Sequence, residues 1–370
     1  MRVAIAGGIT GGHLFPALVV AQALQARGHE VLYLGAKHGI EGRVPLPVPH
    51  ALLEMSGLRS TQRTLWSLLQ TIWRVRGEAH RHLQAFGAEV MFTTGGYASV
   101  PIALAFLRLS KRLVLLEPDA LPGKANRWLA RRAVRICVNF EEAAQVFGRA
   151  TTMRTGLPVR PEVYLPDVEP TTARDHFGLK RDKFCVLVVG GSQGAQALNE
   201  AALNTVQYLP LSELQWLHIT GEAHFELVRS TAERLGLNGN YHPRAFLPAR
   251  EMGLAYRAAD VVVGRGGAGS LTEFALNGLP MILVPYPHAA GGHQRYNCTA
   301  LAARGAAEVI DQAALSPQRL AERLLELRDC PQRRAQMQAA ARAWAIPNAA
   351  ERIVQLLEEV GACTHPQVSA

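Results

Sequence analysis

The chain has 370 residues, 48% of them hydrophobic, which favours two domains and excludes wholesale disorder. No apolar run approaches the roughly 20 residues of a membrane span, and no cleavable apolar core follows Met1, so we expect neither a transmembrane helix nor a signal peptide. The five cysteines form no CxxC pair, so we expect no zinc site and no disulfide framework, which fits a reducing compartment. The net charge is +9: residues 1–160 hold 20 Lys and Arg against 9 Asp and Glu, a net of +11, and the remainder holds 19 against 21, a net of −2. Such a basic half attracts nucleic acid, phosphate ligands or an anionic membrane face.

The first elements in the chain are typical of a nucleotide-binding α/β domain. We predict a buried strand at Val3–Ala6, a glycine-rich phosphate-type loop at Gly7–His13, a helix at Leu14–Arg27 and a second strand at Glu30–Gly35. A dinucleotide site needs an acidic residue after that second strand, but residues 36–38 read Ala-Lys-His, and the glycines lack the GxGxxG spacing. NAD is therefore not the expected ligand.

The segment Thr64–Phe86 is predicted to form an amphipathic helix with a basic flank. One interpretation is a helix that packs on the core and exposes its basic side to solvent. The other is a helix at the membrane surface, where Trp and Leu enter the lipid and Arg meets the phosphates, and the two can hold at different ends of the helix. The apolar stripe comprises Leu65, Trp66, Leu69, Ile72 and Trp73, and the basic flank comprises Arg63, Arg74, Arg76 and Arg81.

The first half continues with alternating strands and helices. A second glycine turn, Gly95–Ser99, follows one predicted strand, and Glu117–Asp119 follows the next. We expect the half to end in an inter-domain crossing at Arg154–Arg160, with a proline-rich linker at Pro161–Pro170. The predicted strands are Glu89–Thr94, Arg112–Leu116 and Val134–Asn139, and the predicted helix is Gly123–Arg132.

The pattern then restarts, because Val186–Ala195 repeats the strand, paired glycines and loop of the chain's beginning and leads into a helix at Gln196–Val206. Two such starts predict an α/β fold with two Rossmann-like, doubly wound domains that face each other across a cleft. The predicted later strands are Gln215–Ile219, Tyr241–Phe246, Asp260–Val263, Met281–Val284 and Ala307–Ile310, followed by helical residues 317–359 with a break at Ile346–Asn348. The predicted domains are residues 1–160 and 161–345, with a helix at 346–360 that packs back on the first domain and a tail at 361–370.

The stretch from Gly264 to Asn297 is predicted to form one wall of the nucleotide cleft. Its glycines follow a strand, and Ser270 and Thr272 then open a helix with Glu273 in the first turn, where backbone N–H groups face an anion. A polar loop with His288, His293, Gln294 and Asn297 is expected after the next strand.

Six motifs in order make the chain resemble the MurG family, the bacterial UDP-GlcNAc:lipid I N-acetylglucosaminyltransferases of glycosyltransferase family 28. The motifs are GGITGGHLFPAL, SGLR, GGYAS, GLPVR, GGSQGA and HQRYN, together with the helix start at Glu273, and they span nearly the whole chain. The sequence departs from the family at Ile9, where a glycine is usual, and at Asp119, where an amide is usual. The first departure predicts a stiffer loop, and the second puts the role of residue 119 in question.

The resemblance implies a GT-B fold and a set of site residues. Glu273 would accept both ribose hydroxyls, Arg160 would bind the donor diphosphate, and Gln294 would select the GlcNAc hydroxyls. A catalytic metal is not expected, because no DxD-like pair stands in a sugar-nucleotide loop, and no cofactor is implied. The remaining donor-site residues are Thr10, Gly11, Gly12, Asp119, Ser192, Leu247, Ala268, Gly269 and Ser270, while Arg265 is as well explained by a structural role in its turn.

The general base has two candidates in the first half. Imidazole exchanges protons near neutral pH, so His13 suits deprotonation of the acceptor hydroxyl or binding of the acceptor diphosphate. Asp119 is the rival base, since a carboxylate there can take a proton that an amide cannot. The order of preference is His13, then Asp119.

The implied reaction is transfer of GlcNAc, with inversion, from UDP-GlcNAc to the muramyl C4 hydroxyl of undecaprenyl-diphosphate-linked MurNAc-peptide, which converts lipid I to lipid II in peptidoglycan synthesis. The expected location is the cytoplasmic face of the membrane, peripherally bound through an anionic surface, with cell-wall synthesis proteins as further candidate partners. The alternatives are a UDP-GlcNAc 2-epimerase, a glycolipid transferase or a membrane scaffold that only binds nucleotide sugar. Nucleic acid is the least favoured partner, because the arginines do not alternate with aromatic residues.

Overall fold

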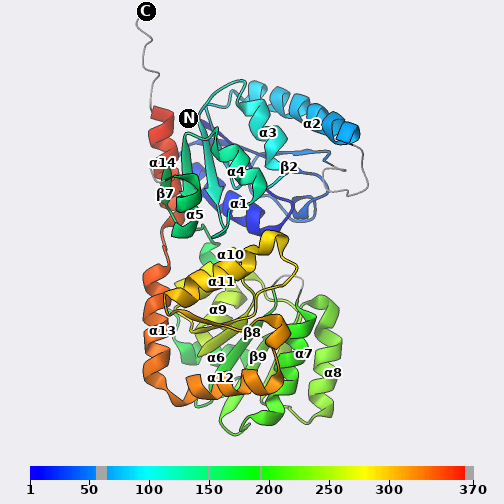
Figure 1. Ribbon diagram of the computed structural model, residues 1–370, viewed down its shortest axis with the longest axis vertical. Helices are drawn as coiled ribbons and strands as arrows, with labels where there is room; N and C mark the ends of the chain where they lie inside the picture. Colours follow the sequence, from blue (N-terminus) through cyan, green and yellow to red (C-terminus); the bar gives the residue numbers. More distant parts are fainter. Residues whose placement is uncertain (56–64, 149–150, 192–193, 363–370) are drawn as a thin grey trace, which may run out of the picture. The chain divides into compact units, whose positions relative to one another are not determined.

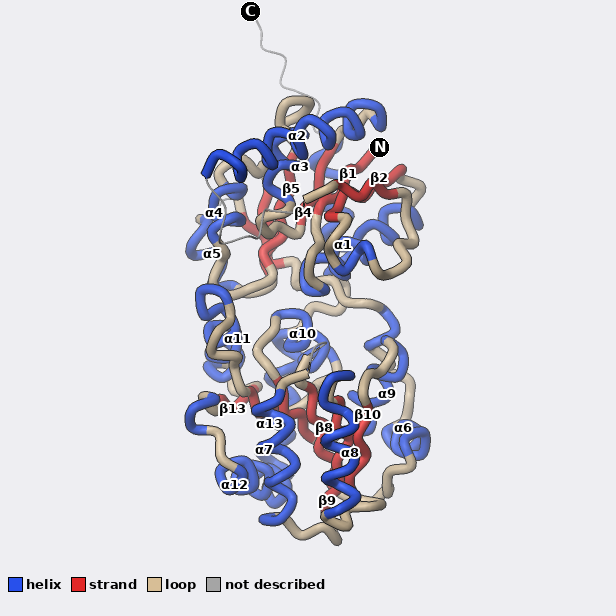
Figure 2. The backbone as a smooth tube through the Cα atoms, turned by 90° about the vertical axis from the view of Figure 1, so that its right-hand side faces the viewer, coloured by secondary structure: helices blue, strands red, loops and turns tan. Residues whose placement is uncertain are grey.

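The computed structural model describes residues 1–55, 65–148, 151–191 and 194–362 (Figure 1). The chain divides into two compact units. The first unit comprises Met1–Val159 together with the residues from Ile346 onward, and the second comprises Arg160–Ala345. Each unit is a parallel sheet with helices on both faces, which confirms the predicted α/β class with two Rossmann-like folds (Figure 2).

The sheet of the first unit has seven parallel strands among the described residues, in the order β3-β2-β1-β4-β5-β6-β7. Its central strands are buried apolar runs, as expected for a sheet covered on both faces; all five residues of β5 are buried. The strands are β1 (Arg2–Ala6), β2 (Glu30–Ala36), β3 (His50–Leu53), β4 (Val90–Thr93), β5 (Leu113–Glu117), β6 (Arg135–Val138) and β7 (Thr152–Arg154). The helices are α1 (Gly11–Ala26), α2 (Leu65–Phe86), α3 (Ser99–Phe106), α4 (Lys124–Ala130), α5 (Glu141–Phe147) and α14 (Ala349–Ala362).

The C-terminal helix α14 packs against α1 in the first unit (Figure 1). Glu358 on α14 accepts hydrogen bonds from Arg27 at 2.9 Å and from the His29 ring at 2.8 Å. Gly156 has no side chain where a Cβ would lie 2.8 Å from Ile346, so the chain can return to this unit in close contact. The last helix therefore completes the fold of the unit in which the chain begins.

The sheet of the second unit has the order β10-β9-β8-β11-β12-β13, and the described part of the unit contributes six parallel strands to it. These are β8 (Phe184–Val189), β9 (Leu214–Ile219), β10 (Tyr241–Arg244), β11 (Val261–Gly264), β12 (Met281–Leu283) and β13 (Ala307–Val309). The helices are α6 (Pro170–Phe177), α7 (Gln196–Thr205), α8 (Phe225–Arg234), α9 (Ala249–Ala258), α10 (Ala268–Leu276), α11 (His293–Ala303), α12 (Pro317–Asp329) and α13 (Pro331–Trp344).

Several sequence-based expectations differ from the structure. The first helix begins at Gly11, so Pro16 lies inside α1 and not in its first turn. Strands β3 and β7 were not predicted, because both are short edge strands with few buried residues. Residues 161–170 are not a free linker. They begin with the 3₁₀ turn η2 (Pro161–Val163), whose Val163 is fully buried in the second unit.

Another difference is the expected polar loop after β12. His293, Gln294 and Asn297 lie on helix α11, because the loop ends earlier, at Gly291 and Gly292. Both glycines have positive φ, 63° and 70°, and Gly292 is the residue that precedes the helix. Left-handed backbone of this kind turns the chain into the helix and favours glycine.

Candidate functional site

The strand orders place one candidate site in each unit. In an open parallel sheet, ligands bind beyond the carboxyl ends of neighbouring strands whose connections leave in opposite directions. In the first sheet this point lies between β1 and β4, and in the second it lies between β8 and β11. Each of these four strands is followed by a glycine-containing turn.

The histidine of the first site has a fixed ring orientation. His13 lies in the first turn of α1, and its Nδ1 is 2.9 Å from the carbonyl oxygen of Thr94, just beyond β4. Because a carbonyl only accepts, Nδ1 carries the proton in this contact, and in neutral imidazole Nε2 is then the basic nitrogen. The Thr94 hydroxyl donates back to the His13 carbonyl at 2.9 Å. Two hydrogen bonds thus tie the start of α1 to the end of β4.

A buried polar network holds the two turns beside this histidine. The Gly96 amide donates to Asn126 Oδ1 at 3.0 Å, and Asn126 Nδ2 donates to Glu117 Oε2 at 2.8 Å. Glu117 Oε1 accepts the Asp119 amide at 2.9 Å. A Cβ at Gly96 would lie 3.3 Å from His13 Nε2, so the turn runs close to the imidazole.

Glu117 and Asp119 interact electrostatically in this network. Burial, and then the charge of Asp119, raise the pKa of Glu117 to about 8. Asp119 itself is partly exposed, which keeps it a candidate base beside His13.

The glycine loop before α1 contains a strained residue. Ile9 has φ of 68°, a left-handed conformation that is costly for a β-branched side chain. Its amide donates to both carboxylate oxygens of the buried Glu41, at 3.0 and 2.8 Å, which holds the backbone in place. The structure thus shows strain at the position where the sequence suggested stiffness. Beyond it, Thr10, Gly11 and Gly12 are not fully buried, and a Cβ at Gly12 would meet no atom within 4 Å.

The second site is a hollow of about 870 Å³ at the ends of β8 and β11. The start of helix α7 lines one side, with Ala195, Gln196 and Ala197, and the start of α10 lines another, with Gly267 and Ser270. The first N–H groups of a helix attract anions, so two helix N-termini make this hollow suited to a diphosphate. Its remaining lining residues are Gly190, Gly191, Gly194, Glu200, Arg265, Tyr286, Gln294 and Gln312.

Glu273 lies in the second turn of α10, because this helix begins at Ala268 and not at Ser270 as expected. The helix dipole acts mainly on the first turn, so it does not account for an acidic residue here. Tyr256 on α9 donates its hydroxyl to Glu273 Oε2 at 2.7 Å. Burial raises the pKa of Glu273, whereas the Tyr256 hydrogen bond and the nearby charge of Arg160 oppose that rise.

Gln294 and Arg265 have structural contacts at the hollow. Gln294 Oε1 accepts the amides of Gly266 at 3.2 Å and Tyr286 at 3.0 Å, which orients its Nε2 as a donor. Arg265 is buried and donates to the Val284 carbonyl at 3.0 Å and to Gln312 Oε1 at 2.8 Å. The contacts of Arg265 thus correspond to the structural role that the sequence left open.

The other predicted donor residues fall into three groups. Ala268 is buried at the start of α10, and Gly269 and Ser270 beside it are partly exposed. Leu247 is buried after β10 and has an exposed neighbour, Phe246. Ser192 lies outside the described residues.

Helix α2 presents two different faces. Its buried face comprises Thr71, Val75, Ala79 and Leu83, at a spacing of four residues. Trp66, Leu69 and Trp73 lie on another face and are 70%, 41% and 65% exposed, while Ile72 is partly buried; the side chain of Leu65 lies outside the described part. No described helix is long and apolar enough to cross a membrane.

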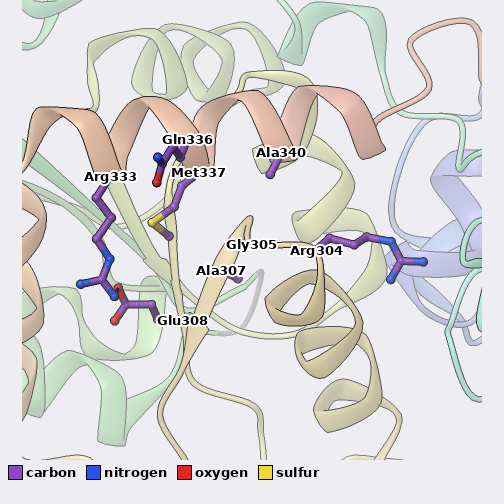
Figure 3. A pocket seen from close by; sticks show the side chains of 8 residues that line it. All are labelled: Arg304, Gly305, Ala307, Glu308, Arg333, Gln336, Met337 and Ala340. Atoms are coloured by element: carbon purple, nitrogen blue, oxygen red, sulfur yellow. Dashed lines mark ion pairs between the residues drawn. The ribbon is translucent and has the colours of Figure 1, made fainter.

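A smaller hollow of about 350 Å³ lies elsewhere in the second unit, between β13 and α13 (Figure 3). Arg333 and Glu308 point toward each other there and form an ion pair at 2.7 Å, whereas Arg304 points away. None of the predicted site residues lines it. Across the described ranges, no three His, Cys, Asp or Glu side chains gather as a metal site requires.

Sequence reasoning missed three residues at or beside the candidate sites. Tyr256 contacts Glu273, Asn126 contacts Gly96 and Glu117, and Glu41 contacts Ile9. Each is a single residue within an ordinary helix or turn, without a motif of its own. The signal for Glu41 is its residue type and its position. A glutamate close to a glycine-rich loop is rarely buried unless polar groups pair with it, so its carboxylate was a candidate partner for that loop.

Two family models and a full-length relative match this sequence along nearly the whole chain. The glycosyltransferase family 28 N-terminal domain matches residues 3–138, and the family 28 C-terminal domain matches residues 185–353. A Moorella thermoacetica protein named UDP-N-acetylglucosamine--N-acetylmuramyl-(pentapeptide) pyrophosphoryl-undecaprenol N-acetylglucosamine transferase is 39% identical over an alignment that covers 96% of this chain and 98% of that protein.

Solved structures extend the comparison to the fold. The crystal structure of Acinetobacter baumannii MurG is similar with a TM-score of 0.77 and 28% identity, covering 97% of this chain and 99% of that one. A UDP-GlcNAc 2-epimerase from Neisseria meningitidis is similar with a TM-score of 0.68 over 97% and 100% of the two chains, but at 12% identity it shows the fold alone. The chain belongs to glycosyltransferase family 28 and has the GT-B fold.

Proposed function

We propose that this protein transfers N-acetylglucosamine from UDP-GlcNAc to lipid I and so forms lipid II in peptidoglycan synthesis. The observation that carries the proposal is the 39% identity, over almost the full length of both chains, to a transferase named for this reaction. The hollow with two helix N-termini supports it, because a sugar nucleotide carries a diphosphate. A UDP-GlcNAc 2-epimerase has the same fold, so the fold alone does not distinguish a transferase from an epimerase.

The second unit binds the donor in this proposal. Glu273 accepts the ribose hydroxyls, Arg160 and the N-termini of α7 and α10 bind the diphosphate, and Gln294 donates its Nε2–H to a GlcNAc hydroxyl. The positive charge of Arg160 opposes the rise in the pKa of Glu273, so this guanidinium acts on the carboxylate proposed to bind ribose. Ser192, Ala268, Gly269 and Ser270 are the further phosphate and sugar contacts, and the backbone at Leu247 contacts the uracil.

The first unit supplies the base and acceptor contacts. His13 Nε2 takes the proton of the muramyl C4 hydroxyl, O4 forms a bond to C1 of GlcNAc, and the bond from C1 to the diphosphate oxygen breaks, so UDP leaves and the configuration inverts. The Thr94 contact holds the ring in the required tautomer. Thr10, Gly11 and Gly12 offer backbone N–H groups, and Asp119 remains the alternative base.

Activity assays with the purified chain test this function. Labelled UDP-GlcNAc and a lipid I analogue are expected to give UDP release and a disaccharide product that depend on the analogue. Release of 2-epimerised sugar without the analogue would indicate the epimerase. Binding of UDP-GlcNAc without either product would indicate a scaffold.

We also propose that α2 lies against the cytoplasmic face of the membrane. Trp66, Leu69 and Trp73 are exposed on one face of this helix, and Arg76 lies 5.3 Å from the Trp73 ring. Aromatic and leucine side chains enter the lipid boundary, and arginines attract anionic headgroups. This orientation brings the enzyme to its lipid-linked acceptor.

The double substitution Trp66→Ala/Trp73→Ala is expected to weaken binding to anionic vesicles at least about tenfold, since each lost indole contributes more than one kcal/mol of apolar burial. Vesicle co-sedimentation measures the effect. The matched control, Leu227→Ala/Leu235→Ala, removes two exposed apolar side chains from α8 and its end in the second unit. Equal loss in both variants would contradict a specific role of α2.

A further inference from the structure

Tyr256 is a buried phenol that points at the carboxylate proposed to bind ribose. It lies on α9, is 2% exposed, and donates to Glu273 Oε2 on α10 at 2.7 Å. Burial and the negative charge of Glu273 raise the pKa of Tyr256 well above 10, so the hydroxyl keeps its proton and acts as a donor. Its ring lies edge-on to Phe274, with centroids 5.7 Å apart and an interplanar angle of 76°.

The three segments around this pair are tied together. Gly253 on α9 allows close approach of η2, since a Cβ there would lie 2.5 Å from the Glu162 carbonyl oxygen. Asn277, at the end of α10, donates Nδ2 to the Val163 carbonyl at 3.0 Å and to the Glu273 carbonyl at 2.9 Å. The segment that begins at Arg160 is therefore fixed to both helices that carry the Tyr256–Glu273 pair.

We infer that Tyr256 is a positioning residue: its hydroxyl fixes the Glu273 carboxylate so that Oε1 and the outer lone pair of Oε2 meet the two vicinal hydroxyls of a ribose. The inference rests on the proposed role of Glu273 in donor binding. A carboxylate has about four lone-pair directions, and the phenol occupies one on the inner side. A glutamate without this contact would be free to rotate about its terminal bond, which has only a weak torsional preference.

The contact also controls the charge of Glu273. Among the described residues, Tyr256 on α9 and Arg160, which directly precedes η2, act against the effect of burial on the pKa of this carboxylate. Removing the hydroxyl removes an influence that lowers the pKa of Glu273. The protonated acid accepts fewer hydrogen bonds, so nucleotide affinity would then fall at a higher pH as the solution is acidified.

The test compares the affinities of UDP and 2′-deoxy-UDP for the full chain by calorimetry across pH. Wild type is expected to prefer UDP by about tenfold, as for a hydrogen bond to a charged group. Tyr256→Phe keeps the ring against Phe274 and is expected to reduce the preference for UDP to below about threefold. The acid limb of UDP affinity, which is the pH range over which affinity falls on acidification, is expected to lie at higher pH than in wild type. Tyr241→Phe is the matched control, because Tyr241 is also buried in the second unit and its hydroxyl lies 2.6 Å from His218 Nδ1.

Glu273→Gln separates the two hypotheses that could fail. If Glu273→Gln abolishes the preference for UDP while Tyr256→Phe retains both the preference and the wild-type acid limb, Tyr256 is not a positioning residue. If Glu273→Gln retains the preference, ribose binding by Glu273 is wrong and the inference falls with it. In the supported case, Tyr256→Phe adds little in the Glu273→Gln background, as expected for two residues that act together.

A second variant tests the inference if Tyr256→Phe does not fold. A ring-fluorinated tyrosine at position 256 keeps the hydroxyl and makes it a stronger donor. The acid limb of UDP affinity is then expected to move to lower pH, the opposite direction from Tyr256→Phe. An unchanged limb in this variant would overturn the inference without any loss of packing.

Discussion

Replacing His13 by alanine is expected to lower kcat at least about 100-fold and up to about 10⁴-fold, the range for loss of a general base. The contact from Nδ1 to the Thr94 carbonyl leaves Nε2 as the basic nitrogen, so the ring is oriented for proton transfer before the acceptor binds. KM for UDP-GlcNAc is expected to change little, because the imidazole is proposed to act on the acceptor hydroxyl and not to bind the donor. Steady-state kinetics with a lipid I analogue measures both constants.

Asp119→Asn distinguishes the rival base. This change replaces the carboxylate by an amide of the same shape and removes the charge that helps raise the pKa of Glu117. A small effect on kcat is expected if His13 is the base. His38→Ala is the matched control, since His38 is an exposed histidine of the same unit, paired with Glu54 at 2.8 Å. If His13→Ala costs less than about 100-fold while Asp119→Asn costs more, the base is Asp119.

The sheets of both units were largely predictable, for a physical reason. Strands covered on both faces must be continuous apolar runs, and segments such as Val186–Val189 stand out between polar stretches. The edge strand His50–Leu53 lacks that signal because only Leu53 is fully buried. The sequence also suggested a longer loop after β12, but Gly291 and Gly292 end that loop and helix α11 begins at the next residue, His293.

The site was predictable only where one motif carries one function. His13 and Glu273 stand in recognisable glycine-rich contexts. Tyr256 lies 17 residues before Glu273 on another helix, and Asn126 lies nine residues after Glu117, so only folding brings the members of each pair together. The positive φ of Ile9 is likewise invisible in the sequence, because a β-branched residue rarely adopts it and its support comes from Glu41, 32 residues away.

Glu273→Gln is expected to lower kcat/KM for UDP-GlcNAc about 100-fold, mainly through KM. The carboxylate is proposed to accept two ribose hydroxyls, and each hydrogen bond to a charged group contributes about 1.5–3 kcal/mol. A ground-state contact of this kind affects binding of substrate and transition state alike, so kcat should fall much less. Burial raises the pKa of Glu273, so the wild-type advantage over the glutamine variant should shrink as the pH falls toward the pKa of that carboxyl.

Two measurements make the Glu273 prediction specific. The control Glu222→Gln removes the charge of an exposed glutamate in the same unit and should leave kcat/KM within about twofold, as surface substitutions away from special features usually do. The affinity for UDP should fall in Glu273→Gln as much as kcat/KM does, because UDP contains the ribose. A large fall in kcat with unchanged UDP affinity would instead mean that Glu273 acts on the transition state and not on ribose, since only an interaction made in the transition state lowers kcat alone.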